Sequence, residues 1–123
     1  MADGTRIAVL LEDDPNVREA LEFLLSDLGW FALGADRAQN ALERLPAGPG
    51  AVGLIITDFN LGDGVNGVDE ARTLMEAGVR APVLVMSSSM RGKAELAARA
   101  AGHDYLAKPV EAARVEAWVA AKS

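Results

Sequence analysis

No cysteine occurs in the 123 residues, and no apolar run approaches the roughly 18 residues that a membrane-spanning helix requires. The first absence excludes a disulfide framework and a thiolate metal site. Basic residues are in deficit as well, with 12 Lys and Arg against 18 Asp and Glu and a net charge of −6. Because direct binding of nucleic acid requires a basic patch, this balance argues against it and is compatible with a site that binds a cation.

The beginning of the chain lacks the features of a signal peptide. The apolar stretch Ile7–Leu11 is too short for one, and acidic residues follow it. The chain also contains no linker or low-complexity tract, and its length suits one domain with a hydrophobic core. We therefore expect a single domain over residues 1–123 that is cytoplasmic and has no membrane partner.

Short apolar runs alternate with segments of helical periodicity along the chain. The runs are almost continuously apolar, which is typical of parallel strands covered on both faces. Strands are expected at 6–11, 30–33, within 52–60 as far as Asp58, 81–86 and 104–107, and helices at 15–28, 38–45, 68–78, 92–101 and 110–121. This strict alternation predicts a doubly wound α/β fold, with a five-stranded parallel sheet, right-handed crossovers and five helices on its two faces.

Local signals mark the ends and faces of these helices. Pro15 suits the first helical position with Asp14 as its N-cap, and Asp36 can cap the second helix. The fourth helix is rich in alanine and has Leu96 as its only large aliphatic residue, so it buries little and should be held less firmly than the first. The inward face of the first helix is expected to carry Val17, Ala20, Leu21, Leu24, Leu25 and Leu28.

Polar side chains stand directly after four of the five expected strands. In chain order they are Glu12, Asp13 and Asp14, then Asp58, Ser87 and Lys108. Parallel strands bring their carboxyl ends to one rim of the sheet, so these groups can meet there. Several carboxylates on one rim repel unless a cation joins them, and Mg²⁺ prefers one or two carboxylates together with waters and a phosphate oxygen.

The remaining two groups suit the same chemistry. Lys108 supplies a movable positive charge for a phosphate, and Ser87 supplies a hydroxyl that can donate to it. A carboxylate at the end of a buried strand, a metal, a lysine and a hydroxyl together describe an aspartyl-phosphate site. Asp58 is the expected nucleophile of that site.

With this set of residues, the sequence resembles the receiver domain of the response-regulator family, the phosphoacceptor half of two-component signalling. The segments that match are 9–14, 54–60, 82–88 and 104–109, and the resemblance covers essentially the whole chain. It implies a flavodoxin-like sheet with strand order 2-1-3-4-5. It also implies Mg²⁺-dependent phosphoryl transfer to Asp58 from a phosphohistidine of a histidine kinase or phosphotransfer protein, with an unknown downstream protein as partner. Such a domain is not an enzyme, and catalyses only its own phosphorylation and dephosphorylation.

The resemblance also assigns the metal ligands. Asp13 would bind Mg²⁺ directly and Glu12 largely through water, with Asp58 and the backbone carbonyl of Asn60 as further ligands. Asp14, in the variable third position, is better explained as a helix cap.

Four further residues match the switching apparatus of the family. Ser87 would be the hydroxyl switch residue, and Tyr105 the aromatic residue that turns inward when Ser87 moves toward the phosphoryl group. Lys108 would neutralise that group, and Pro109 would follow it through a cis bond. The surface made by the fourth helix, fifth strand and fifth helix would thereby be remodelled.

Asn60 and Ser89 flank the path that a hydrolytic water would take in such a site, so we expect them to tune dephosphorylation. Replacing both with alanine should change the lifetime of the phosphorylated protein, measured by its decay after the phosphodonor is removed. An unchanged lifetime in the double variant would contradict this expectation.

Two departures from the family pattern concern the loop after Asp58. The family usually has proline where this chain has Gly62, and the loop is one residue longer before Gly67. Both changes are expected to loosen the loop. The switch residue Ser87 also lacks the methyl group of the commoner threonine, which biases the rotamer.

Other interpretations remain open from the sequence alone. The chain could be a degenerate receiver used only as an interaction surface, although the complete set of site residues argues against this. It could also be a Mg²⁺-dependent phosphatase that forms an aspartyl phosphate, but such enzymes carry a second aspartate where this chain has Asn60. Tyr105 could simply pack in the core, and His103 is expected to be solvated.

Overall fold

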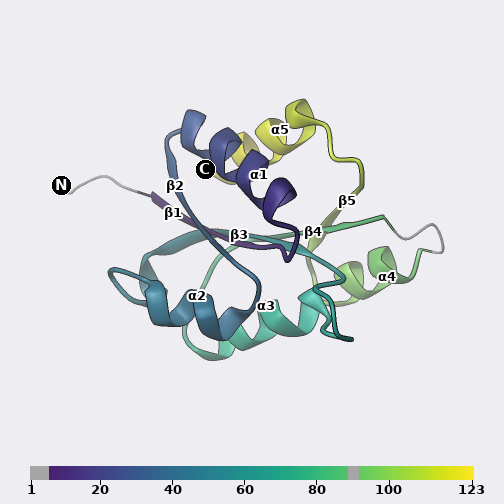
Figure 1. Ribbon diagram of the computed structural model, residues 1–123, viewed down its shortest axis with the longest axis horizontal. Helices are drawn as coiled ribbons and strands as arrows, with labels where there is room; N and C mark the ends of the chain where they lie inside the picture. Colours follow the sequence, from purple (N-terminus) through teal and green to yellow (C-terminus); the bar gives the residue numbers. More distant parts are fainter. Residues whose placement is uncertain (1–5, 89–91) are drawn as a thin grey trace.

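The computed structural model describes residues 6–88 and 92–123, and in these residues five parallel strands form one sheet in the order β2-β1-β3-β4-β5. The strands are β1 (Arg6–Leu11), β2 (Trp30–Ala35), β3 (Val52–Asp58), β4 (Val83–Ser87) and β5 (Asp104–Ala107). The α-helices are α1 (Pro15–Asp27), α2 (Ala38–Arg44), α3 (Gly67–Glu76), α4 (Lys93–Ala100) and α5 (Ala112–Lys122), with a short 3-10 helix η2 (Pro49–Ala51) before β3. Helices α1 and α5 cover one face of the sheet, and α2, α3 and α4 cover the other (Figure 1). The predicted doubly wound fold and strand order are confirmed.

The sheet separates two apolar cores, and this arrangement explains the nearly continuous apolar strands. In β3, Ile55 packs into the core under α2 and α3, while its neighbours Leu54 and Ile56 pack into the core under α1 and α5. All three are fully buried. Because successive side chains point to opposite faces, a strand covered on both sides has no position for an exposed polar residue.

Helix α1 begins as the sequence predicts. The carboxylate of Asp14 accepts a hydrogen bond from the Asn16 amide at 2.9 Å, and Pro15 occupies the first turn. The helix ends before Gly29, whose φ of 89° suits glycine. One assignment was wrong, because Ala20 is exposed and does not lie on the inward face.

The beginning of α2 also differs from the prediction. Asp36 does not cap this helix; its carboxylate instead accepts a hydrogen bond from the Asn40 side chain at 2.7 Å. The amide of Ala38 donates to Glu70 Oε1 of α3 at 2.8 Å, so the cap comes from another helix. Strand β2 before it continues to Ala35, two residues beyond the predicted end at Leu33.

The two C-terminal helices are attached differently. Leu96 of α4 is 73% exposed, and the buried residues of this helix are Ala94 and Ala98, so α4 buries little, as predicted. Helix α5 buries Val115 and Val119.

None of the helices in residues 6–88 and 92–123 has the length and apolar character needed to cross a membrane.

Candidate phosphoacceptor site

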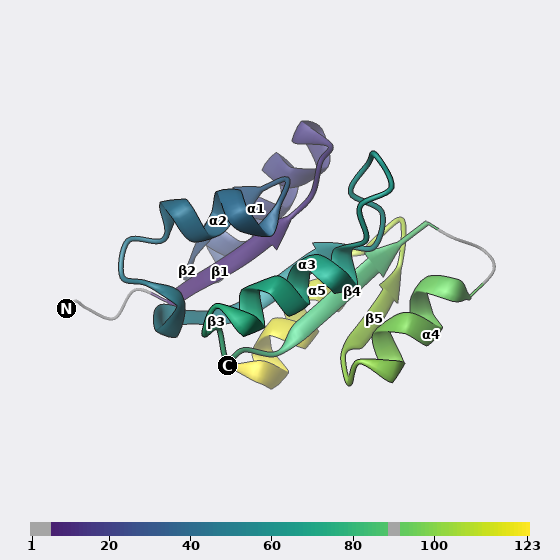
Figure 2. The same cartoon turned by 90° about the horizontal axis from the view of Figure 1, so that it is seen from below.

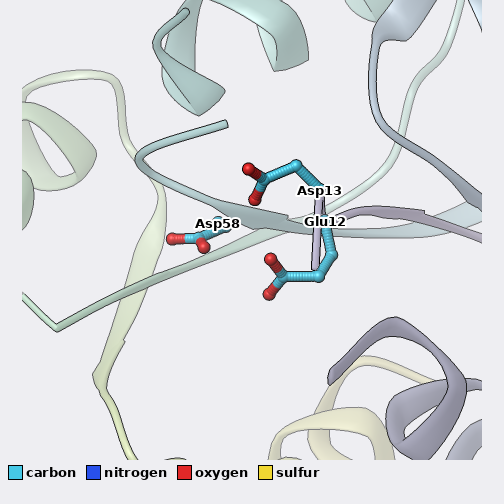
Figure 3. A group of neighbouring side chains, drawn as sticks. All are labelled: Glu12, Asp13 and Asp58. Atoms are coloured by element: carbon cyan, nitrogen blue, oxygen red, sulfur yellow. The ribbon is translucent and has the colours of Figure 1, made fainter. Parts of the chain in front are cut away.

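Three carboxylates meet at the carboxyl ends of β1 and β3. Glu12 and Asp13 directly follow β1, and Asp58 is the last residue of β3. Leu11 and Thr57 are paired in the sheet, so the residues after them emerge side by side. One oxygen from each carboxylate lies within 4.8 Å of the others. Figure 3 shows Glu12 and Asp13 branching to opposite sides of the end of β1, with Asp58 beside them.

The lysine after β5 reaches this group of acids. Lys108 Nζ donates to Asp58 Oδ2 at 2.8 Å and to Glu12 Oε1 at 2.9 Å. Its backbone amide donates to the Ser87 carbonyl at 2.8 Å, which fixes the start of the turn, and its bond to Pro109 is cis. Residues distant in the sequence are therefore gathered in one pocket.

Burial and charge act against each other in this pocket. Burial raises the pKa of Glu12, with a smaller contribution from the charge of Asp58, while the hydrogen bond from Lys108 opposes the shift. Burial alone would lower the pKa of Lys108, but its hydrogen bonds to Asp58 and Glu12, together with the negative charges of these two acids, outweigh burial and raise the pKa. The ammonium group is therefore held in its charged form against the acids.

The predicted switch residues lie on the neighbouring strands. Ser87 is the last residue of β4 and is only 4% exposed, and its neighbour Met86 pairs with Asp58 of β3. Tyr105 of β5 is half-buried, and its hydroxyl donates to the Ser87 carbonyl at 3.5 Å. The structure therefore brings Ser87 beside the pocket and Tyr105 beside Ser87. Ser89 lies outside the described residues.

The loop after Asp58 projects beyond the strand ends (Figure 2). Asn60 is exposed, its amide donates to Asp58 Oδ1 at 3.4 Å, and its side-chain oxygen accepts from the Gly62 amide at 3.0 Å. Asn60 also forms an antiparallel bridge with Asn66, and the Leu61 amide donates to the Val65 carbonyl at 3.0 Å. The loop is thus closed on itself.

The backbone conformation of the loop and its closeness to Asp13 require glycine at position 62. Its φ is 85°, and a Cβ atom placed on it would lie 3.0 Å from Asp13 Oδ2. Proline, whose φ is near −65°, does not fit this backbone. The guanidinium of Arg37 also donates to the Leu61 carbonyl at 2.9 Å. This contact restrains the loop that the sequence was expected to loosen.

Two arginines that touch the site were not singled out in the sequence. Arg18 of α1 donates from Nη1 to the Glu12 carbonyl at 2.8 Å, and Arg37 contacts the loop after Asp58. Both donate to backbone carbonyls, which leave no trace in a sequence. An arginine on a helix face or in a turn is ordinarily solvated, so only the tertiary structure assigns these contacts.

The donor set fits a hard divalent cation. Three carboxylates share the pocket, and Lys108 pairs with two of them, Asp58 and Glu12. The third, on Asp13, is exposed at the mouth of the pocket. Carboxylate oxygens with open positions for water and phosphate are what Mg²⁺ prefers. The residues present therefore match the predicted metal.

A parallel sheet with an acidic pocket and a lysine at its carboxyl rim is the arrangement of a receiver domain. The chain matches the family model of the response regulator receiver domain over residues 8–120, and it belongs to that family. The response regulator protein PilR of Pseudomonas aeruginosa is 30% identical over 114 residues, which are 92% of this chain and 25% of that protein. The cell cycle transcriptional regulator CtrA of Caulobacter vibrioides is 29% identical over 105 residues, which are 82% of this chain and 43% of that protein. The chain therefore spans less than half the length of these curated relatives.

Solved structures show the same fold. A response regulator receiver protein from Burkholderia phymatum is 28% identical with a TM-score of 0.78, over 95% of this chain and 94% of that chain. A receiver domain from Clostridium thermocellum has a TM-score of 0.81 at 19% identity, over 95% of this chain and 93% of that chain. The second likeness concerns the fold alone.

Proposed function

We propose that this chain is a phosphoacceptor signalling module in which Asp58 accepts a phosphoryl group from a phosphohistidine of a histidine kinase or phosphotransfer protein. The pairing of Asp58 Oδ2 with Lys108 Nζ at 2.8 Å, beside Glu12 and Asp13, carries this proposal. A carboxylate that attacks a phosphorus atom is repelled by the negative phosphoryl oxygens, so the attack needs positive charge nearby to offset this repulsion.

In the transfer step, a carboxylate oxygen of Asp58 forms the new bond to phosphorus. The phosphorus–nitrogen bond of the donor breaks, and its electron pair remains on the imidazole nitrogen. Lys108 neutralises negative charge during the transfer, because its ammonium already contacts Asp58 and can donate to the transferred phosphoryl oxygens. Asp13, Asp58 and the Asn60 carbonyl would hold Mg²⁺, with Glu12 acting through water, and the bound ion would neutralise phosphoryl oxygens.

The consequence of phosphorylation is a change of the surface formed by α4, β5 and α5. The acyl phosphate adds roughly −1 to −2 of charge, by analogy with other phosphorylated side chains. The hydroxyl of Ser87 then moves toward it and Tyr105 turns inward, which alters what a downstream protein meets. Helix α4 suits this role because its largest aliphatic residue, Leu96, is already exposed.

The activity is non-enzymatic in the sense that the domain catalyses only its own phosphorylation and dephosphorylation. We propose that the domain acts in the cytoplasm and makes no direct contact with nucleic acid. Incubation with acetyl phosphate and Mg²⁺, followed by intact mass over time, tests the proposal. A stable adduct supports it, whereas rapid turnover of added phosphate esters indicates a phosphatase and the absence of an adduct indicates a degenerate receiver.

A groove beside Lys108 suits the approach of the protein donor. It has a volume of about 560 Å³, and apolar side chains from α1 and the turn after β5 line most of it. Its lining includes Val17, Ala20, Leu21, Pro109 and Val110, together with Lys108. The exposed Ala20 leaves room for a helix that presents its phosphohistidine to Asp58.

Ala20→Arg is expected to distinguish phosphoryl transfer from a protein donor from phosphoryl transfer from a small donor. The long charged side chain fills the groove, so transfer from a phosphorylated histidine kinase that labels the wild type should slow by about tenfold or more. Labelling by acetyl phosphate should be unchanged, because the small donor does not need the groove. Ser26→Arg, on the same helix but outside the groove, is the control. Equal slowing with both donors would contradict docking at this surface.

A further inference from the structure

We propose that Arg37 is a positioning residue that holds the loop between β3 and α3 against the carboxylate of Asp13, and thereby sets the affinity for Mg²⁺ and the lifetime of the phosphoryl group. The consequences for Mg²⁺ and phosphate rest on the proposed function. The contact itself is a feature of this chain, in which the loop is long and rich in glycine.

The guanidinium of Arg37 binds the loop through its backbone. Nη1 donates to the Leu61 carbonyl at 2.9 Å, and Nη2 lies 3.5 Å from the Gly62 carbonyl. Two adjacent carbonyls are thus contacted by two nitrogen atoms of one rigid planar group, and a lysine ammonium, which is a single point charge on a flexible stem, does not reproduce this geometry. Arg37 also lies 3.9 Å from Asp63, but that carboxylate is 96% exposed, so this ion pair adds little.

Arg37 is itself held in place from the other side. Its Nη1 also donates to the Asp36 carbonyl at 2.7 Å, and its side chain is only 26% exposed. The residue occupies the N-cap position of α2, and the next amide, that of Ala38, is bound by Glu70 of α3. The turn between β2 and α2 is therefore a firm base from which Arg37 reaches the loop.

The loop transmits this restraint to the acidic pocket. Gly62 lies against Asp13, close enough that an added Cβ would stand 3.0 Å from Oδ2. The amide of Gly62 is bonded to the side chain of Asn60, and the Asn60 amide is bonded to Asp58. Without Arg37, the glycines at 62 and 64 allow the loop many conformations, and the Asn60 carbonyl loses its fixed place.

Three variants separate the restraint from its charge. Arg37→Met removes the guanidinium but keeps the aliphatic stem, and Arg37→Lys keeps the charge without the two-armed contact. Arg44→Met is the matched control. Arg44 lies at the other end of α2 and, like Arg37, donates to a backbone carbonyl, that of Gly34 at 2.7 Å, but it does not touch the loop. Losing a positive charge would by itself strengthen the binding of a cation, so weaker binding cannot be an effect of charge.

Hydrogen exchange and Mg²⁺ binding are both measured by nuclear magnetic resonance. In the metal-free protein, the amide of Leu61, which donates to Val65, should exchange about tenfold faster in Arg37→Met than in wild type. The Mg²⁺ dissociation constant should rise about tenfold, as expected when a group that orients a metal ligand is lost. In Arg37→Lys, the exchange rate of the Leu61 amide and the Mg²⁺ dissociation constant should stay close to those of Arg37→Met. The lifetime of the acetyl-phosphate adduct should change in both Arg37 variants.

The outcomes distinguish this inference from the proposed function. If Arg37→Met matches Arg44→Met in Leu61 exchange and Mg²⁺ affinity while the wild type is labelled, Arg37 has no positioning role and the proposed function stands. If the wild type is not labelled, the proposed function fails, and the exchange and Mg²⁺ data still decide the role of Arg37. Should Arg37→Met melt at a much lower temperature, Arg37→Lys gives the decision, and full rescue by lysine overturns the inference.

Discussion

Asp58→Asn is expected to abolish labelling by acetyl phosphate and Mg²⁺. The amide has nearly the shape of the carboxylate but offers no anionic oxygen to attack phosphorus, so the loss should be complete. The fold should remain, because Lys108 keeps its 2.9 Å bond to Glu12 and the repulsion between Asp58 and Glu12 disappears. Intact mass after incubation measures the first effect, and the thermal unfolding transition measures the second.

The matched control for this variant is Asp63→Asn. Asp63 lies in the adjacent loop and its side chain is 96% exposed, so the same chemical change there should leave labelling intact. Labelling of Asp58→Asn that persists at the wild-type rate would show that another residue accepts the phosphoryl group.

Gly67→Ala is expected to have the largest effect on stability. Gly67 begins α3, and a Cβ atom there would overlap the backbone carbonyl oxygen of Asp58 and lie 2.6 Å from Thr57 Oγ1. Backbone cannot yield as a flexible side chain can, so either α3 or the end of β3 must move. Overpacking of this kind costs about 3 kcal/mol of unfolding free energy. Because the atoms displaced belong to Asp58, labelling should slow as well.

Urea unfolding measures this cost against Gly50→Ala. An added Cβ at Gly50 meets no atom within 4 Å, so that variant isolates the effect of the alanine itself. It should be as stable as the wild type or slightly more stable, because alanine restricts the unfolded chain. Equal unfolding free energies for the two variants would show that the turn into α3 has room that the structure does not indicate.

Much of the fold follows from local pattern. The bounds of β1 at Arg6–Leu11 and of β5 at Asp104–Ala107 were predicted without error, because each run ends at an abrupt change of polarity or at a helix cap. Strand β2 runs two residues further than predicted, through Gly34 and Ala35, whose small side chains give no strong signal. These residues are buried by their neighbours, with Arg18 and Glu22 lying over Gly34.

The cap of α2 could not be predicted in the same way. Asp36 has the right residue type and position, but its carboxylate bonds to Asn40, and Glu70 takes the cap from 32 residues away. The partner becomes adjacent only when α3 packs beside α2. A cap supplied across two helices is a tertiary contact, and local sequence rules do not contain it.

The members of the candidate site were predictable because parallel strands share a rim. A polar residue directly after an apolar strand has a known location, and Asp58, Glu12 and Lys108 all meet there. The supporting contacts were not predictable, since Arg18 and Arg37 donate to main-chain carbonyls of Glu12 and Leu61. Whether those carbonyls are within reach depends on the path of the backbone.

Gly62 has a consequence for any attempt to stabilise this chain by consensus design. Replacing an unusual residue by the one most common among relatives often improves stability. Here the usual proline would meet a backbone with a φ of 85° and a carboxylate at the place of its side chain. The substitution would force the turn to refold away from Asp13, so a consensus library for this chain should keep glycine at position 62.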